Sequence, residues 1–123
     1  VSLHLKINTG MNRLGFIPED VEKVLQFIRD HKNLKLTGVC THLMSAEDLS
    51  QPEGISFQQI EKFHGVVQKF KLDHLTQHVY NSHGFLNALN SKICQSQYVY
   101  GMRPGIALWG IHPDSQDQSQ QLY

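Results

Sequence analysis

The chain has 123 residues, with eleven basic and eleven acidic side chains that give a formal net charge of zero when His is neutral. A chain of this length builds one ordinary core, so two full domains are excluded. The balanced charge argues against a basic nucleic-acid-binding surface, and an apolar content of 40% argues against a disordered chain. No stretch approaches the ~18 consecutive apolar residues of a membrane span, and the first residues do not resemble a signal peptide.

The cysteines and histidines do not form a metal-binding pattern. Cys40 and Cys94 are far apart and make no C-x-x-C pair, which favours reduced thiols of a cytosolic protein over a disulfide or a zinc ribbon. His74 and His78 have the spacing of a metal pair on a helix. The segment leads into a predicted strand and offers no third ligand, so we expect no metal site.

The first quarter of the chain predicts a strand and a helix. Residues 1–7 alternate apolar and polar side chains, which is typical of a strand with one buried face. Residues 8–16 contain two Gly and two Asn and predict a loop. Pro18 and the two acids after it mark the start of a helix that ends between residues 29 and 33. One face of this helix carries Val21, Val24, Leu25 and Ile28.

A second strand and a second helix follow. Residues 34–43 predict the strand, and residues 45–54, which are polar and include Pro52, predict a loop. We expect Ser56 to cap the helix after this loop. The apolar stripe of the helix consists of Phe57, Ile60, Phe63, Val67 and Phe70.

The last third of the chain predicts shorter elements. Residues 78–80 predict a strand, residues 81–84 a turn and residues 85–89 a short helix. Residues 98–102 predict a fourth strand, and residues 103–110 a turn and a tight final segment. Strands alternating with helices indicate a parallel α/β sheet. Four strands are too few for a closed barrel, so the sheet is either a small open domain or half of a barrel.

In parallel sheets, functional residues collect just after the carboxyl ends of the strands. Arg13, His42 and Arg103 occupy such positions, and Asn81–Ser82 follows the remaining strand. These groups suit a small anionic ligand. Taken singly, a solvated loop charge also explains Arg13, and a hydrogen-bonded core histidine also explains His42. Lys6 lies on the polar side of the first strand and fits either a paired role or solvent exposure.

Ser82 and the backbone N–H groups of Gly105 and Ile106 form a candidate phosphate site. Hydroxyl and N–H groups at a helix start bind anions, and barrel enzymes often hold phosphate with the loops after their last two strands. The plain alternative is that Ser82 only caps a helix and Gly105 only permits a tight turn. Caps far outnumber phosphate sites, so these residues alone favour the alternative.

Four segments together resemble motifs of bacterial alanine racemases. Residues 5–15 (LKINTGMNRLG) resemble the K-x-D-T-G-M-x-R-x-G segment of that family, and residues 102–110 (MRPGIALWG) resemble its R-P-G-I-A-x-Y-G segment. Residues 41–46 (THLMSA) resemble its T-H-F-x-x-A segment, and residues 80–82 (YNS) its N-S turn. The resemblance covers residues 1 to about 113 in the family's order and approximate spacing, and it favours the phosphate site over the cap.

The resemblance implies the second half of a TIM-type (β/α)8 barrel, with four βα units that supply its fifth to eighth strands. Residues 1–113 would form this half, and residues 114–123, rich in Gln and Ser, a linker or loop toward an absent β-rich C-terminal domain. Members of this family are cytoplasmic bacterial homodimers that bind pyridoxal 5′-phosphate and interconvert L- and D-alanine for peptidoglycan synthesis. The implied partners are an amino-acid substrate and a second subunit, with no nucleic acid and no membrane.

The resemblance also assigns roles to individual residues. Arg103 would face the pyridine nitrogen; because Arg can only donate, that nitrogen stays unprotonated and transamination is suppressed. His42 would hydrogen-bond Arg103 and fix its direction. Arg13 would lie near the phenolic oxygen and the substrate carboxylate, beside Lys6, which is carbamylated in some members. The implied catalytic residues are Arg13, His42, Arg103 and Lys6. The implied cofactor-binding residues are Asn81, Ser82, Arg103, Gly105, Ile106, His42 and Arg13.

The chain departs from the family pattern at Asn8, where Asp is usual, and at Trp109, where Tyr is usual. It also matches neither the family's Schiff-base lysine segment, V-V-K-A-N-A-Y-G-like, nor the tyrosine of the C-terminal domain. Racemisation needs a base on each face of the α-carbon, so we expect the 123 residues alone to be inactive. The absence of an initial Met fits a fragment or a processed product, and an open half-barrel predicts poor stability.

Three other interpretations stay open. One is a racemase of serine, lysine or broad specificity, since the absent domain contributes to substrate choice. Another is a non-catalytic protein that binds pyridoxal phosphate on a similar barrel; the Arg13 loop argues against it, because a carrier needs no clamp for a substrate carboxylate. The third is a gene remnant without function.

Overall fold

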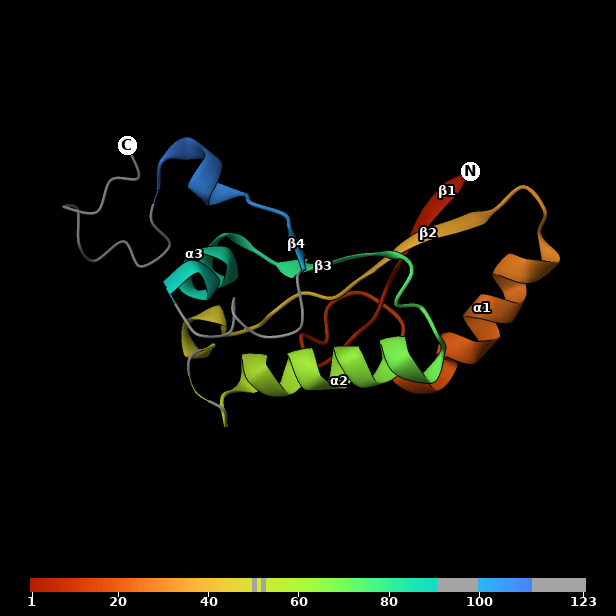
Figure 1. Cartoon of the computed structure of the whole chain (residues 1–123), viewed down its shortest axis with the longest axis horizontal. Helices are drawn as coiled ribbons and strands as arrows, with labels where there is room; N and C mark the ends of the chain where they lie inside the picture. The colour runs from red at the N-terminus through yellow and green to blue at the C-terminus, as the bar shows by residue number, and fades with distance from the viewer. Residues whose placement is uncertain (50, 52, 91–99, 112–123) are drawn as a thin grey trace.

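Four parallel strands form one sheet, in the order β1-β2-β3-β4 (Figure 1). The computed structural model describes residues 1–49, 51, 53–90 and 100–111. The strands are β1 (Ser2–Lys6), β2 (Lys35–Cys40), β3 (Thr76–Tyr80) and β4 (Gly101–Met102). This parallel, sequential order confirms the α/β architecture predicted from the alternation of strand and helix patterns.

Helices connect the strands, and α2 runs lengthwise along the sheet (Figure 1). The described helices are α1 (Val21–Asp30), α2 (Ile55–Lys69) and α3 (Ser82–Asn90). Short 3₁₀ turns are η1 (Pro18–Asp20), η2 (Ala46–Asp48) and η4 (Ile106–Trp109). None of the helices in the described residues has the length and hydropathy of a membrane-crossing segment.

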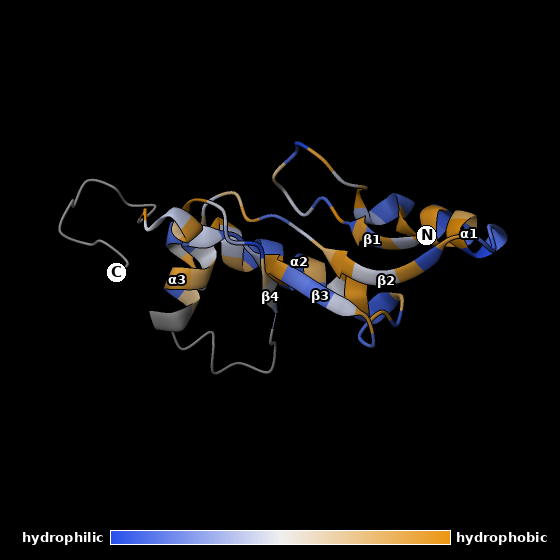
Figure 2. Cartoon of the chain, turned by 90° about the horizontal axis from the view of Figure 1, so that it is seen from above, coloured by the Kyte–Doolittle hydropathy of each residue, from blue (hydrophilic) through white to orange (hydrophobic). Residues whose placement is uncertain are grey.

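The core lies between the sheet and α2. Phe63 of α2 is fully buried, and its ring makes an edge contact with Tyr100, at a centroid distance of 5.9 Å. The apolar set of β1 points into this core, in keeping with its period of two. Figure 2 shows that the strands carry both apolar and polar residues. The strands contribute Leu5, Val39 and Val79, and the helices Val21, Leu25, Ile60, Phe63, Val66 and Val67.

The start of α2 differs from the sequence-based expectation. The helix begins at Ile55 with Gly54 at its N-cap, so Ser56 lies inside the first turn and is fully buried. The predicted cap at Ser56 is therefore wrong. The buried face is also partly polar, because it includes Gln59, whereas Phe57 is only half-buried. Apolar periodicity alone misses buried polar groups that serve another purpose.

The start of α3 also differs. Residues 82–84 were expected in a turn, but α3 already begins at Ser82. The side-chain oxygen of Asn81 accepts a hydrogen bond from the Gly84 N–H, at 2.8 Å, which is the geometry of an N-cap. Asn81 is thus the cap, and the hydroxyl of Ser82 is directed elsewhere. Of the predicted strand 98–102, residues 98 and 99 lie outside the described residues.

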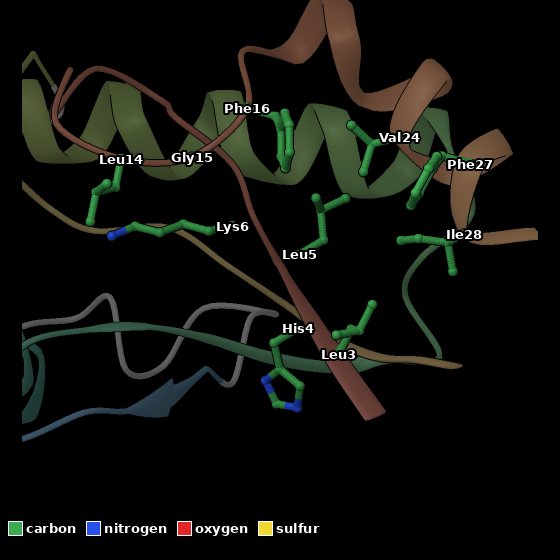
Figure 3. Close-up of a pocket in the computed structure, with 10 residues that line it drawn as sticks. All are labelled: Leu3, His4, Leu5, Lys6, Leu14, Gly15, Phe16, Val24, Phe27 and Ile28. Carbon is green, nitrogen blue, oxygen red and sulfur yellow. The ribbon is translucent and has the colours of Figure 1, made fainter. Parts of the chain in front are cut away.

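Apolar side chains are exposed near both edge strands of the sheet. Near β4, Leu108 and Trp109 are 72% and 78% exposed. Near β1, an open apolar cavity of about 460 Å³ lies between the strand and α1 (Figure 3). It is lined by Leu3, His4, Leu5, Lys6, Leu14, Gly15, Phe16, Val24, Phe27 and Ile28. Exposed apolar edges of this kind fit the predicted open half-barrel.

Candidate functional site

The carboxyl ends of the four strands bring the predicted polar residues to one edge of the sheet. Lys6 ends β1, and the loop that carries Arg13 follows it. His42 comes two residues after β2, and Arg103 directly follows β4. Asn81 and Ser82 connect β3 to α3. Parallel strands place these ends side by side, so residues distant in sequence share one region.

The loop that carries Arg13 is closed at its base and braced from inside. Phe16 donates its N–H to the carbonyl of Lys6 (2.9 Å), and the N–H of Asn8 donates to the carbonyl of Phe16 (2.8 Å). The Asn8 side chain accepts hydrogen bonds from the N–H groups of Gly10 and Asn12 and donates one to the Asn12 side chain. The usual Asp could make the first two bonds but not the third, which gives the departure at position 8 a local role.

Gly15 is required where this loop returns to the strand. Its φ is +111°, and an added Cβ would lie 2.9 Å from the carbonyl oxygen of Lys6. L-residues rarely adopt that backbone conformation, and the approach leaves no room for a methyl group. The glycine of the predicted motif therefore fixes the loop geometry that holds Arg13.

Arg103 is held by several hydrogen bonds at the ends of the strands. Its guanidinium donates to the carbonyls of His78 (2.7 Å) and Thr41, and to the ring Nδ1 of His78. Its backbone N–H donates to the carbonyl of Tyr80 (2.8 Å). Arg has five N–H donors, so two remain for another acceptor beyond these three contacts in the described residues.

The partner of Arg103 differs from the expectation. The resemblance implied a hydrogen bond with His42, whereas in the described residues the guanidinium bonds His78 and the backbone of Thr41. From the sequence, His78 was a candidate only for a metal pair with His74. The sequence spacing could have indicated a role for His78 at the site. His78 and Tyr80 stand two apart on β3 and so share one face, directly before Asn81 and Ser82. Among the described residues, no group of three His, Cys, Asp or Glu side chains is arranged to hold a metal ion.

The site is electrostatically positive. Burial lowers the pKa of His42, and the charges of Arg13, Lys6 and Arg103 lower it further. Burial raises the pKa of the Cys40 thiol, while Arg103 and Lys6 oppose that rise. Lys6 and Arg103 thus act on both groups, and Arg13 acts on His42 as well. This field favours an anionic ligand and keeps His42 neutral at neutral pH.

Ser82 forms the second polar centre. Its hydroxyl is 6% exposed and accepts hydrogen bonds from the N–H groups of Gly105 (2.8 Å) and Ala107 (3.3 Å). A Cβ added to Gly105 would lie 3.9 Å from this oxygen, in ordinary contact with it. Hydroxyl and N–H groups at the start of α3 and η4 therefore converge, as in anion sites at helix N-termini. Ala107 was not predicted, because the sequence pattern placed the second N–H donor at Ile106.

A buried amide links the loops of the site to the core. Gln59 of α2 is 2% exposed, and its Nε2 donates to the carbonyl of His42 (3.1 Å) and to the hydroxyl of Thr9 (3.3 Å). Its Oε1 accepts the N–H of Met44 (2.8 Å). Thr9 and Thr41 share a further hydrogen bond of 2.7 Å between their hydroxyls. Gln59 thus fixes the loops after β1 and β2 relative to one another.

Replacing Gln59 with Leu tests this link. The substitution keeps the approximate volume but leaves the Met44 N–H and the His42 carbonyl without their partner, so we expect a loss of about 1–3 kcal/mol in the free energy of unfolding. Urea denaturation measures it. Gln68→Leu, at an exposed position of the same helix, is the matched control and should change the value by no more than about 0.5 kcal/mol. Equal effects of the two variants would contradict a specific role of Gln59.

The fold and the site define a parallel α/β protein with a cationic site and a hydroxyl–amide cradle at the carboxyl ends of its strands. The family model described as "Alanine racemase, N-terminal domain" matches residues 1–113. The chain therefore belongs to the alanine racemase N-terminal domain family. The similarity that was first seen in four motifs extends over the whole of this range.

Relatives and solved structures agree with this assignment. The chain is 33% identical to the alanine racemase of Chlorobaculum tepidum over 92% of its own length and 28% of the relative. It is 36% identical to the alanine racemase of Geobacter sp. (strain M21), over 96% of its own length and 31% of the relative. It thus spans about three-tenths of the curated relatives that it matches.

Among solved structures, alanine racemase of Clostridium difficile 630 in complex with cycloserine gives a TM-score of 0.70 at 27% identity, over 93% of this chain and 30% of that one. The biosynthetic alanine racemase of Pseudomonas aeruginosa gives a TM-score of 0.72 at 25% identity, over 99% of this chain and 31% of that one. The four-stranded sheet therefore matches part of the barrel domain of these enzymes, in agreement with the half-barrel expectation.

Proposed function

We propose that the chain supplies the half of an alanine racemase barrel that holds the phosphate and the pyridine ring of pyridoxal 5′-phosphate. The observation that carries this proposal is the convergence of the Ser82 hydroxyl with the Gly105 N–H, at 2.8 Å, beside Arg103 at the same sheet edge. Family membership supports it independently. The whole protein would be a cytoplasmic bacterial homodimer that supplies D-alanine for peptidoglycan.

The residues present suit both ends of this cofactor. Ser82, the start of α3 and the N–H groups of Gly105 and Ile106 would hold the phosphate, with Asn81 fixing the turn as the helix cap. Arg103 has two donors left for the ring nitrogen.

The bound cofactor would supply the electron sink that makes the α-proton of an amino acid acidic. Arg103 presents only donors, so it orients an unprotonated ring nitrogen and delivers no proton to it. Arg13 would bind the substrate carboxylate, and its loop is held in place by Gly15 and Asn8. Lys6, at the base of that loop, adds positive charge, and His42, kept neutral by burial and by these cations, would line the site without adding to that charge.

A chimera tests the proposal. Residues 1–113 replace the matching segment of the Geobacter alanine racemase, which supplies the rest of the protein, and interconversion of L- and D-alanine is measured. We expect the chimera to racemise alanine faster than serine or lysine, and the 123-residue chain alone to be inactive because it lacks both bases. A folded chimera that binds the cofactor but racemises no amino acid would indicate a non-catalytic barrel and would contradict the proposal.

A further inference from the structure

A row of three side chains crosses the site face of the sheet. The Nδ1 of His4, on β1, lies 2.6 Å from the Nε2 of His78, on β3, and the ring centroids are 4.9 Å apart. The Nδ1 of His78 in turn contacts the Arg103 guanidinium. Figure 3 shows the His4 ring on the opposite side of β1 from Leu3 and Leu5. The row thus belongs to the face that carries the predicted site.

Gly38 makes this row possible. β1 and β3 are not neighbours, because β2 lies between them, and His4 pairs with Gly38 in the register. A Cβ at position 38 would lie 2.6 Å from the ring atoms Nδ1 and Cε1 of His4, closer than such contacts allow. The register shift between Leu3 and His4 sets His4 opposite this glycine, as bulges often re-aim a side chain. Because Gly38 has no side chain, the His4 ring can occupy the space above it.

The hydrogen-bond roles along the row follow from Arg103. Because Arg can only donate, the Nδ1 of His78 must accept, and the proton of this neutral ring resides on Nε2. That N–H then donates to the Nδ1 of His4, whose own proton resides on Nε2. Burial, the charge of Arg103 and the nearby His4 lower the pKa of His78 to about 4, which agrees with a neutral ring. The His78 ring is therefore neutral, and each ring holds its neighbour in one orientation.

We propose that His4 is a positioning residue for Arg103: through His78 it fixes the direction of the guanidinium, and Gly38 provides the room for it. The hydrogen-bonded row stands on the geometry of the chain itself. Its consequence for the cofactor ring rests on the proposed function. Without the acceptor on His4, the His78 ring loses its second anchor and rotates more freely, so Arg103 no longer presents its free donors in one direction.

The first test is nuclear magnetic resonance on the ¹⁵N-labelled 123-residue chain. The expected signature is an Nε2–H tautomer for both His4 and His78, with a scalar coupling across the hydrogen bond from the His78 Nε2 to the His4 Nδ1. His4→Phe keeps the ring volume but removes the acceptor, and we expect it to shift the signals of His78 and of the Arg103 side chain. His4→Asn, whose side-chain oxygen can accept in place of Nδ1, should restore them.

Gly38→Ala should abolish the coupling, because the added methyl group displaces the His4 ring. Gly65→Ala is the matched control: a Cβ there meets no atom within 4 Å, and the coupling should persist. If Gly38→Ala fails to fold, His4→Phe and His4→Asn decide the question alone. The Nδ1–H tautomer for His78, or unchanged Arg103 signals in His4→Phe, would overturn the proposal.

A titration with pyridoxal 5′-phosphate separates this inference from the proposed function. We expect His4→Phe to weaken binding on the order of tenfold and His4→Asn to restore most of the affinity. If the wild-type chain shows the coupling but binds no cofactor, the proposed function fails while the positioning of Arg103 by His4 and His78 stands. If the chain binds the cofactor and His4→Phe changes neither the affinity nor the Arg103 signals, the positioning role fails while the proposed function stands.

Discussion

Ser82→Asp is expected to lower the affinity of the chain for pyridoxal 5′-phosphate on the order of 100-fold. The wild-type hydroxyl accepts the N–H groups of Gly105 (2.8 Å) and Ala107 (3.3 Å). A carboxylate at this position would compete for the same donors and would place a negative charge against the incoming phosphate. Because Ser82 is 6% exposed, solvent screens that repulsion poorly.

The measurement is a cofactor titration followed by absorbance, together with the amide signals of Gly105 and Ala107 during a titration with inorganic phosphate. Ser82→Thr keeps the hydroxyl and should retain binding within a few-fold. Ser2→Asp adds the same charge at an exposed position of β1 and is the matched control. Wild-type affinity in Ser82→Asp would place the phosphate elsewhere.

The proposed phosphate cradle was a candidate from the sequence because its parts follow strand ends, although these residues alone favoured a helix cap and a tight turn. Ser82 and Gly105 stand directly after two predicted strands, and parallel strands bring such positions together. The structure adds what the sequence left open, namely which residue caps α3. Since Asn81 takes that role through its bond to the Gly84 N–H, the Ser82 hydroxyl is turned toward Gly105. Helix caps and anion sites use the same residue types, so only the hydrogen bonds in the structure show which of the two roles a given residue takes.

The neighbours of Arg103 were not readable in the same way. His4 and His78 lie 74 residues apart, and periodicity gives the face of a side chain but not its neighbour across two strands. The nearest signal is Gly38, since a glycine inside a strand often marks the close approach of another group. Gln59 was not predicted for a related reason. From the sequence, a polar residue beside the apolar stripe of a helix is expected to face solvent, whereas Gln59 is buried with the stripe.

β1 separates the core from the site by its alternation. Leu5 and Ile7 are buried on the core side, whereas His4 and Lys6 lie on the other set of positions. A register slip of one residue would exchange the two sets and lose the core and the site together. The row of His4, His78 and Arg103 and the position of Lys6 beside it therefore depend on the same pairing of β1 with β2 that buries the core.

The stability of the chain is expected to fall as the pH drops from 7 toward 4. In the unfolded chain a histidine takes up its proton near pH 6.5, whereas burial, Arg103 and His4 lower the pKa of folded His78 to about 4. Between these values the unfolded state binds one more proton, so stability is complete above pH 6.5 and is lost toward pH 4. Burial and the cations around His42 lower its pKa too, so it acts in the same direction.

Urea midpoints at several pH values between 7 and 4.5 measure this loss. Replacing His78 with Asn keeps an acceptor oxygen for Arg103 but removes the titrating ring, so the slope against pH should decrease by about one proton. His74→Asn removes an exposed histidine four residues earlier and is the matched control. The window above pH 4.5 limits the contribution of Glu47, whose pKa is lowered by its hydrogen bond with Ser45. An unchanged slope in His78→Asn would show that His78 is not held neutral between Arg103 and His4.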